Sequence, residues 1–173
     1  MYMNQEKEAM FSINVSNLHW REAANEAEDL CLHGDAVVRI GDECFTYGAT
    51  VSATALYLLK SLKTDHKIGE DNQMLPCCGS FMVPDEALSS VAIIGCPNGI
   101  DWSVLHENGE IVLVTESGKK TRISEEAYRE TVFSFADKIE TFYKESLPKT
   151  YPKDDFERNG YIAFWNEWRS IRY

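Results

Sequence analysis

The sequence predicts an α+β domain in which antiparallel hairpins and meanders form the sheets and helices pack on one side of them. Period-two alternation marks the strands, glycine-containing turns join neighbouring strands, and long segments repeat apolar residues at helical spacing. The chain has 173 residues, of which 44% are hydrophobic. Because a chain of that length can bury a hydrophobic core that is stable without disulfides or metals, we expect one domain over residues 1–173.

The first half reads as a strand, a hairpin and a helix. Residues 10–20 alternate apolar and polar side chains, as in a half-buried strand. Residues 35–47 predict two strands around a tight turn at Gly41. The apolar spacing that follows predicts a helix packed on the sheet, with Thr50 or Ser52 as its N-cap.

Residues 91–123 predict an antiparallel meander of four short strands. The chain reverses at three turn-forming sequences: Pro97-Asn98-Gly99, Asn108-Gly109 and Ser117-Gly118. Ser124 is suited to cap the long helix that follows, and Pro148 to stop it. The buried stripe of this helix is expected at Tyr128, Val132, Phe135, Ile139, Phe142 and Tyr143.

Two segments, residues 9–64 and 80–146, share the order of strands followed by a helix, which suggests two repeats. The similarity is short, and chance explains it as well as duplication does. Residues 155–170 predict a C-terminal aromatic helix after a break at Asn159-Gly160. Its aromatic stripe allows two interpretations, a face docked in the core or a surface that anchors a partner.

Charge narrows the classes of partner. The 17 basic and 28 acidic side chains give a net charge of −11, which repels phosphate backbones and anionic lipid headgroups. We therefore expect no nucleic acid or membrane partner, whereas a basic protein is favoured. The five cysteines are odd in number and follow a polar N-terminal segment, so we expect reduced thiols in the cytoplasm.

The sequence contains no recognisable catalytic motif. Cysteines and histidines lack zinc-site spacing, although Cys31 and His33 share one face of a possible strand, so we expect no metal. Phosphate loops, nucleophile elbows and dinucleotide fingerprints are also missing, so we assign no catalytic residue and no cofactor. The adjacent Cys77 and Cys78 leave open a thiol enzyme that uses a nearby histidine such as His33 or His106.

A compact acidic domain with hairpins and acidic loops resembles, as a whole profile, the immunity proteins of bacterial contact-dependent and polymorphic toxin systems. That resemblance implies a protein-binding inhibitor that occludes the active site of a cognate basic toxin of the nuclease type. The candidate contacts are carboxylates around the first hairpin and aromatic anchors in the last helix: Glu22, Glu26, Glu28, Asp29, Asp42, Glu43, Trp165 and Trp168. A ligand-binding or scaffold module, with a closed apolar pocket between sheet and helix, is the third alternative.

Overall fold

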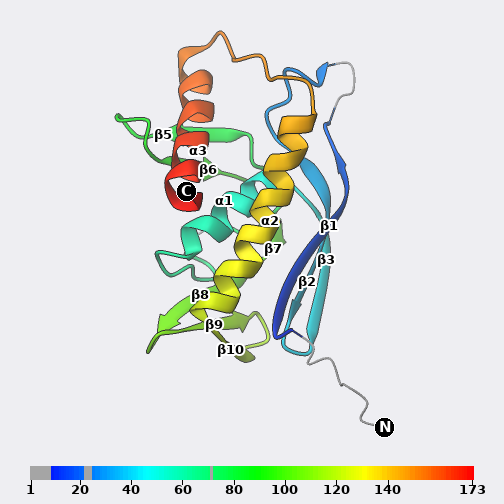
Figure 1. The fold of residues 1–173 in the computed structure, drawn as a ribbon, viewed down its shortest axis with the longest axis vertical. Coiled ribbons are helices and arrows are strands. Elements are labelled where there is room, and N and C mark those ends of the chain that lie inside the picture. Colours follow the sequence, from blue (N-terminus) through cyan, green and yellow to red (C-terminus); the bar gives the residue numbers. More distant parts are fainter. Residues whose placement is uncertain (1–8, 22–24, 71) are drawn as a thin grey trace.

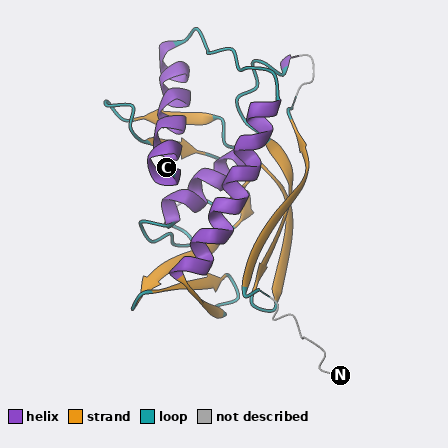
Figure 2. Cartoon of the chain, viewed as in Figure 1, coloured by secondary structure: helices purple, strands orange, loops and turns teal. Residues whose placement is uncertain are grey.

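The computed structural model describes residues 9–21, 25–70 and 72–173. In these ranges the chain forms three helices and several antiparallel sheets, which confirms the α+β class (Figures 1 and 2). The helices lie side by side, with one three-stranded sheet along α2 (Glu125–Glu145) and another at the end where α2 begins (Figure 1). Helix α1 (Val51–Ser61) is buried at the centre, while α2 packs on it and on the first sheet, and α3 (Asp155–Arg172) packs on α1 and on the strands β5 (Phe81–Pro84) and β6 (Val91–Ile94).

The first sheet contains β1 (Phe11–His19), β2 (His33–Ile40) and β3 (Glu43–Ala49) in the order β1-β2-β3. The alternation predicted from the sequence is present, because the side chains that β1 turns inward are buried and pair with buried positions of β2. Gly41 has φ +60° in the turn between β2 and β3, a conformation that glycine adopts without steric cost. The strand and the hairpin are thus confirmed.

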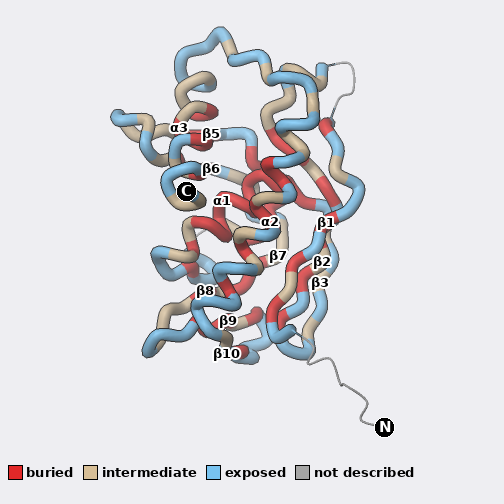
Figure 3. Tube along the Cα trace, in the orientation of Figure 1, coloured by how far each residue is buried: buried red, intermediate tan, exposed pale blue. Residues whose placement is uncertain are grey.

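Helix α1 (Val51–Ser61) is buried along nearly its whole length and lies at the centre of the molecule (Figure 3). Thr50 occupies the N-cap position, one of the two predicted, but its side chain makes no cap bond. Its hydroxyl donates instead to the Cys77 carbonyl at 3.1 Å, and the Ser52 hydroxyl accepts the Leu32 amide at 3.1 Å. At this buried helix start both hydroxyls serve tertiary contacts that local sequence does not encode.

Four short strands follow: β4 (Leu75–Pro76), β5 (Phe81–Pro84), β6 (Val91–Ile94) and β7 (Gly99–Ile100). Their pairing corrects the predicted meander, because β6 pairs with β5 and β7 pairs with β4. A Cβ on Gly99 would collide with the Leu75 carbonyl, and one on Gly95 would lie 2.9 Å from the Cys78 carbonyl. The 95–99 turn therefore lies against β4 and the segment that follows β4. The strands before and after this turn, β6 and β7, do not pair with each other.

The second three-stranded sheet contains β8 (Trp102–Glu107), β9 (Glu110–Thr115) and β10 (Lys120–Ser124) in the order β10-β9-β8. Helix α2 (Glu125–Glu145) follows directly, and the Ser124 hydroxyl accepts the Ala127 amide at 3.1 Å, as predicted for an N-cap. Both three-stranded sheets thus lead into a helix.

Helix α3 (Asp155–Arg172) packs against β5, and Asp154 caps its start. The predicted break at Asn159-Gly160 is wrong, because the helix continues through both residues. Gly160 is needed there because a Cβ would collide with the Met82 carbonyl of β5. None of the helices in the described ranges has the length and apolarity needed to cross a membrane.

The aromatic stripe of α3 faces the core. Trp168 is fully buried and Trp165 is 8% exposed, and their rings pack 5.0 Å apart. The interpretation of these tryptophans as partner-facing anchors is therefore wrong. Their physical role is burial of large aromatic area against α1 and the β5–β6 ribbon.

Candidate functional site

The predicted carboxylates fall into two groups at opposite ends of the first sheet. Glu26, Glu28 and Asp29 precede β2, whereas Asp42 and Glu43 follow it. The eight residues of β2 span about 26 Å at about 3.3 Å per residue. An interface of about 800 Å² per partner is about 32 Å across, so a contact centred on one group extends about 16 Å from it and does not reach the other. Glu22, the remaining predicted carboxylate, lies outside the described residues.

The carboxylates of the first group mainly organise their own loop. Asp29 accepts the amides of Arg21 at 2.6 Å and Cys31 at 3.1 Å, and Glu26 accepts the Leu147 amide at 3.1 Å. Glu28 is exposed and lines a shallow open cavity of about 260 Å³. Glu28 is thus the member of this group whose carboxylate is most available to a partner.

The carboxylates of the second group dock the β2–β3 turn on the β9–β10 turn. Asp42 pairs with Lys119 at 3.0 Å, and this ammonium holds the pKa of Asp42 below its usual value. Glu43 accepts hydrogen bonds from the hydroxyls of Thr115 and Ser117, the latter at 2.9 Å. The two turns therefore form one continuous surface.

Further exposed carboxylates lie on and beyond the second of these turns. Glu116 stands on the β9–β10 turn itself, whereas Glu125 and Glu126 follow the other end of the five-residue strand β10, at the start of α2. All three side chains are exposed, and none makes an ion pair with another described residue. We call this surface the acidic end; its members are Asp42, Glu43, Glu116, Glu125 and Glu126. Sequence reasoning identified only the first two, because more than 70 residues separate them from the others.

A second constellation involves sulfur. Cys77 and Cys96 form a disulfide, and the Cys78 Sγ lies 3.3 Å from the Cys77 Sγ and 3.5 Å from the Cys96 Sγ. We call these three residues the three-sulfur cluster. The expectation that all five cysteines are reduced is therefore wrong for one pair in this structure. The spacing of the cysteines did not predict this pair, since Cys96 is 18 residues beyond Cys78 and belongs to no local motif.

Backbone pairing positions the cluster. Leu75 and Pro76 of β4 pair with Ile100 and Gly99 of β7, and the Cys77 amide donates to the Asn98 carbonyl at 3.2 Å. The segments after β4 and after β6 are thereby held face to face. All three cysteines are partly exposed.

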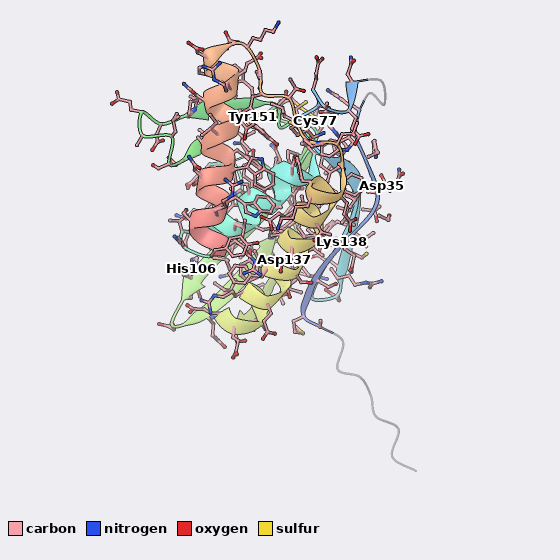
Figure 4. The ribbon with its side chains drawn as sticks, turned by 45° about the horizontal axis from the view of Figure 1, so that its top comes forward. Asp35, Cys77, His106, Asp137, Lys138 and Tyr151 are labelled. Atoms are coloured by element: carbon pink, nitrogen blue, oxygen red, sulfur yellow. A yellow bond between two sulfur atoms is a disulfide. The ribbon has the colours of Figure 1, made fainter. Side chains whose placement is uncertain are left out.

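Of the two histidines considered for a thiol enzyme, His33 lies near the cluster, because the Thr50 hydroxyl that it contacts also donates to the Cys77 carbonyl at 3.1 Å. His33 contacts Thr50, with its Nε2 3.4 Å from the hydroxyl, and burial lowers the pKa of His33. His106 bonds Asp65 at 2.8 Å and lies at the far side of the molecule from Cys77 (Figure 4). The fold therefore does not bring Cys77 and His106 together.

A cavity of about 600 Å³ lies near the end of α1. It is the place to look for the pocket that the ligand-binding alternative requires. The lining of this cavity includes charged and polar side chains, among them Lys60, whose ammonium lies 3.3 Å from the Glu167 carboxylate. His66 also lines it and bonds the buried Asp101 at 2.7 Å. This open cavity has a lining of mixed polarity and so differs from the closed apolar pocket that the ligand-binding alternative predicts.

Comparison with known proteins gave no relative: no family model, curated protein or solved structure matched the chain. The function is therefore inferred from the side chains of this protein, above all those of the acidic end and the three-sulfur cluster.

Proposed function

We propose that this protein is a protein-binding inhibitor of the immunity class, which neutralises a cognate basic toxin by covering its active site. The observation that carries the proposal is the acidic end, where three adjoining structural elements present carboxylates in a chain of net charge −11. A nuclease cleft has to attract phosphate, so a cluster of carboxylates can occupy it as a substrate mimic. The toxin would meet this protein in the cytoplasm.

The arrangement of the acidic end suits such a contact. Asp42 and Glu43 are held in place by Lys119, Thr115 and Ser117, so binding would immobilise few additional side chains at the hairpin tip. Because Lys119 offsets Asp42, the negative field comes mainly from Glu43 and the three exposed glutamates, and Lys120 at the start of β10 reduces it in part. These charges would act chiefly on the rate of association.

The proposal is tested by producing the tagged chain together with the products of the genes encoded beside it, in its own cell background. We expect a basic toxin fragment to co-purify in equal amounts and to associate more slowly as salt is raised. Purification of the chain alone at every salt concentration would contradict the proposal.

A pair of matched variants locates the surface. Changing three glutamates of the acidic end, Glu116→Gln, Glu125→Gln and Glu126→Gln, should slow association by about tenfold or more at low salt. The control removes the same charge from exposed glutamates elsewhere, Glu86→Gln, Glu145→Gln and Glu157→Gln, and should leave the rate nearly unchanged. Equal slowing by both triple variants would mean that net charge, rather than the acidic end, steers the partner.

A further inference from the structure

The three-sulfur cluster has the dimensions of a metal site. Its Sγ atoms all lie within 4.8 Å of one another, and Cys78 is 3.3 and 3.5 Å from its two neighbours. A zinc–thiolate bond of about 2.3 Å places the sulfurs of a tetrahedral site about 3.8 Å apart. Small side-chain rotations, after the disulfide is reduced, are therefore enough to surround one ion.

The other two cysteines show that this convergence is local. Cys31 is 5% exposed in the core, where it donates to the Gly79 carbonyl, and Cys44 is exposed on the outer face of β3. Neither belongs to the group of neighbouring ligand atoms. Convergence of Cys77, Cys78 and Cys96 requires two chain segments to be held together, which β4 and β7 do by pairing.

We propose that the reduced protein binds one thiophilic divalent ion, zinc above all, through the thiolates of Cys77, Cys78 and Cys96. Soft thiolate ligands select zinc over magnesium or calcium, and cysteines in a reducing compartment serve metals more often than structural disulfides. The acidic field of the protein also raises the local concentration of cations.

The chemistry balances as two steps. A cellular dithiol transfers two electrons and two protons to the Cys77–Cys96 disulfide, which breaks the sulfur–sulfur bond, leaves two thiols and oxidises the dithiol to its own disulfide. Three thiols then lose three protons as their sulfurs bind the ion, so the site carries one net negative charge. Among the described residues the group holds three ligands, so water or a partner side chain completes the tetrahedron. The disulfide and the metal-bound form exclude each other.

The experiment uses the full chain, reduced with a phosphine and kept free of oxygen, and titrates it with Co²⁺ as a spectroscopic substitute for Zn²⁺. We expect thiolate-to-cobalt charge transfer that saturates at one equivalent and disappears when Zn²⁺ is added. The chain with the disulfide intact should show no such absorption. Absence of charge transfer in the reduced chain would overturn the proposal.

Single variants assign the ligands. Cys78→Ser should weaken metal binding by more than about 100-fold, because the loss of an outer-shell partner alone costs up to about 100-fold. The thiols of Cys77 and Cys96 stay available in this variant. Cys44→Ser is the matched control and should bind as the parent does. Thermal unfolding of the metal-free reduced chains, equal for parent and Cys78→Ser, shows that the variant folds. Unchanged binding by Cys78→Ser, or loss of binding by Cys44→Ser, would exclude the site.

Discussion

Replacing Asp101 with alanine removes an acceptor from the interior of the protein. The Asp101 side chain is 5% exposed, and its Oδ1 accepts the Met74 amide at 3.1 Å and faces the His66 Nε2 at 2.7 Å. Met74 directly precedes β4 and Asp101 directly follows β7, so this carboxylate ties together the two strands that position the three-sulfur cluster.

The expected cost follows from those two contacts. Each buried donor left without an acceptor costs about 1–3 kcal/mol, and breaking a buried pair from one side costs about 3–5 kcal/mol. We therefore expect Asp101→Ala to lower the free energy of unfolding by about 3–5 kcal/mol. At about 2–4 °C per kcal/mol for a chain of this size, the melting temperature should fall by about 6–20 °C.

Urea unfolding followed by tryptophan fluorescence measures this change, since Trp102 lies beside Asp101 in the core. Asp101→Asn keeps an oxygen acceptor and should lose about 1–2 kcal/mol. Asp42→Ala removes an equal charge from an exposed ion pair and should leave stability unchanged within error. An Asp101→Ala protein within about 0.5 kcal/mol of the parent would refute the reasoning.

Three further outcomes are expected. Iodoacetamide at neutral pH should label exposed Cys44 readily but Cys31 only after unfolding, because burial raises the pKa of Cys31 to about 12; rapid labelling of Cys31 would contradict its placement. NMR titration should place the pKa of Asp85 at about 2, below its usual 3.8, because hydrogen bonds from the following serines favour the charged form. Its stabilising contribution is thus present above pH 3.8 and lost as the pH falls through about 2, and a pKa near 3.8 would show that these bonds are not made. Gly160→Ala should lower the melting temperature although alanine favours helices, because the new methyl group meets the Met82 carbonyl; an unchanged or higher value would contradict that close approach.

Local features of the chain were predictable because they depend on neighbours within one turn or one strand. The alternation of residues 10–20, the hairpin at Gly41 and the cap at Ser124 all correspond to structure. Errors arose where a local signal was overridden by tertiary contact. Gly160 reads as a helix break in sequence, yet it lies inside α3 because β5 passes too close for any side chain.

The candidate sites depended on pairing that local patterns do not encode. Strands of two and four residues, β4 and β5, carry almost no periodic signal, so the partners of β7 and β6 could not be assigned. The same lack of signal hid the approach of Cys96 to Cys77 and Cys78. Two of the five carboxylates of the acidic end were predicted, since the hairpin tip is far in sequence from Glu116, Glu125 and Glu126.

Composition and periodicity by themselves determined the α+β class, the acidic character and the positions of the long helices and the main strands. Only the tertiary structure decided which strands pair, which way the tryptophans of α3 face, and which cysteines meet. The physical reason is range: propensity, turn chemistry and charge act over a few residues or over the whole surface. Burial and sulfur–sulfur proximity, in contrast, arise from contacts between segments tens of residues apart.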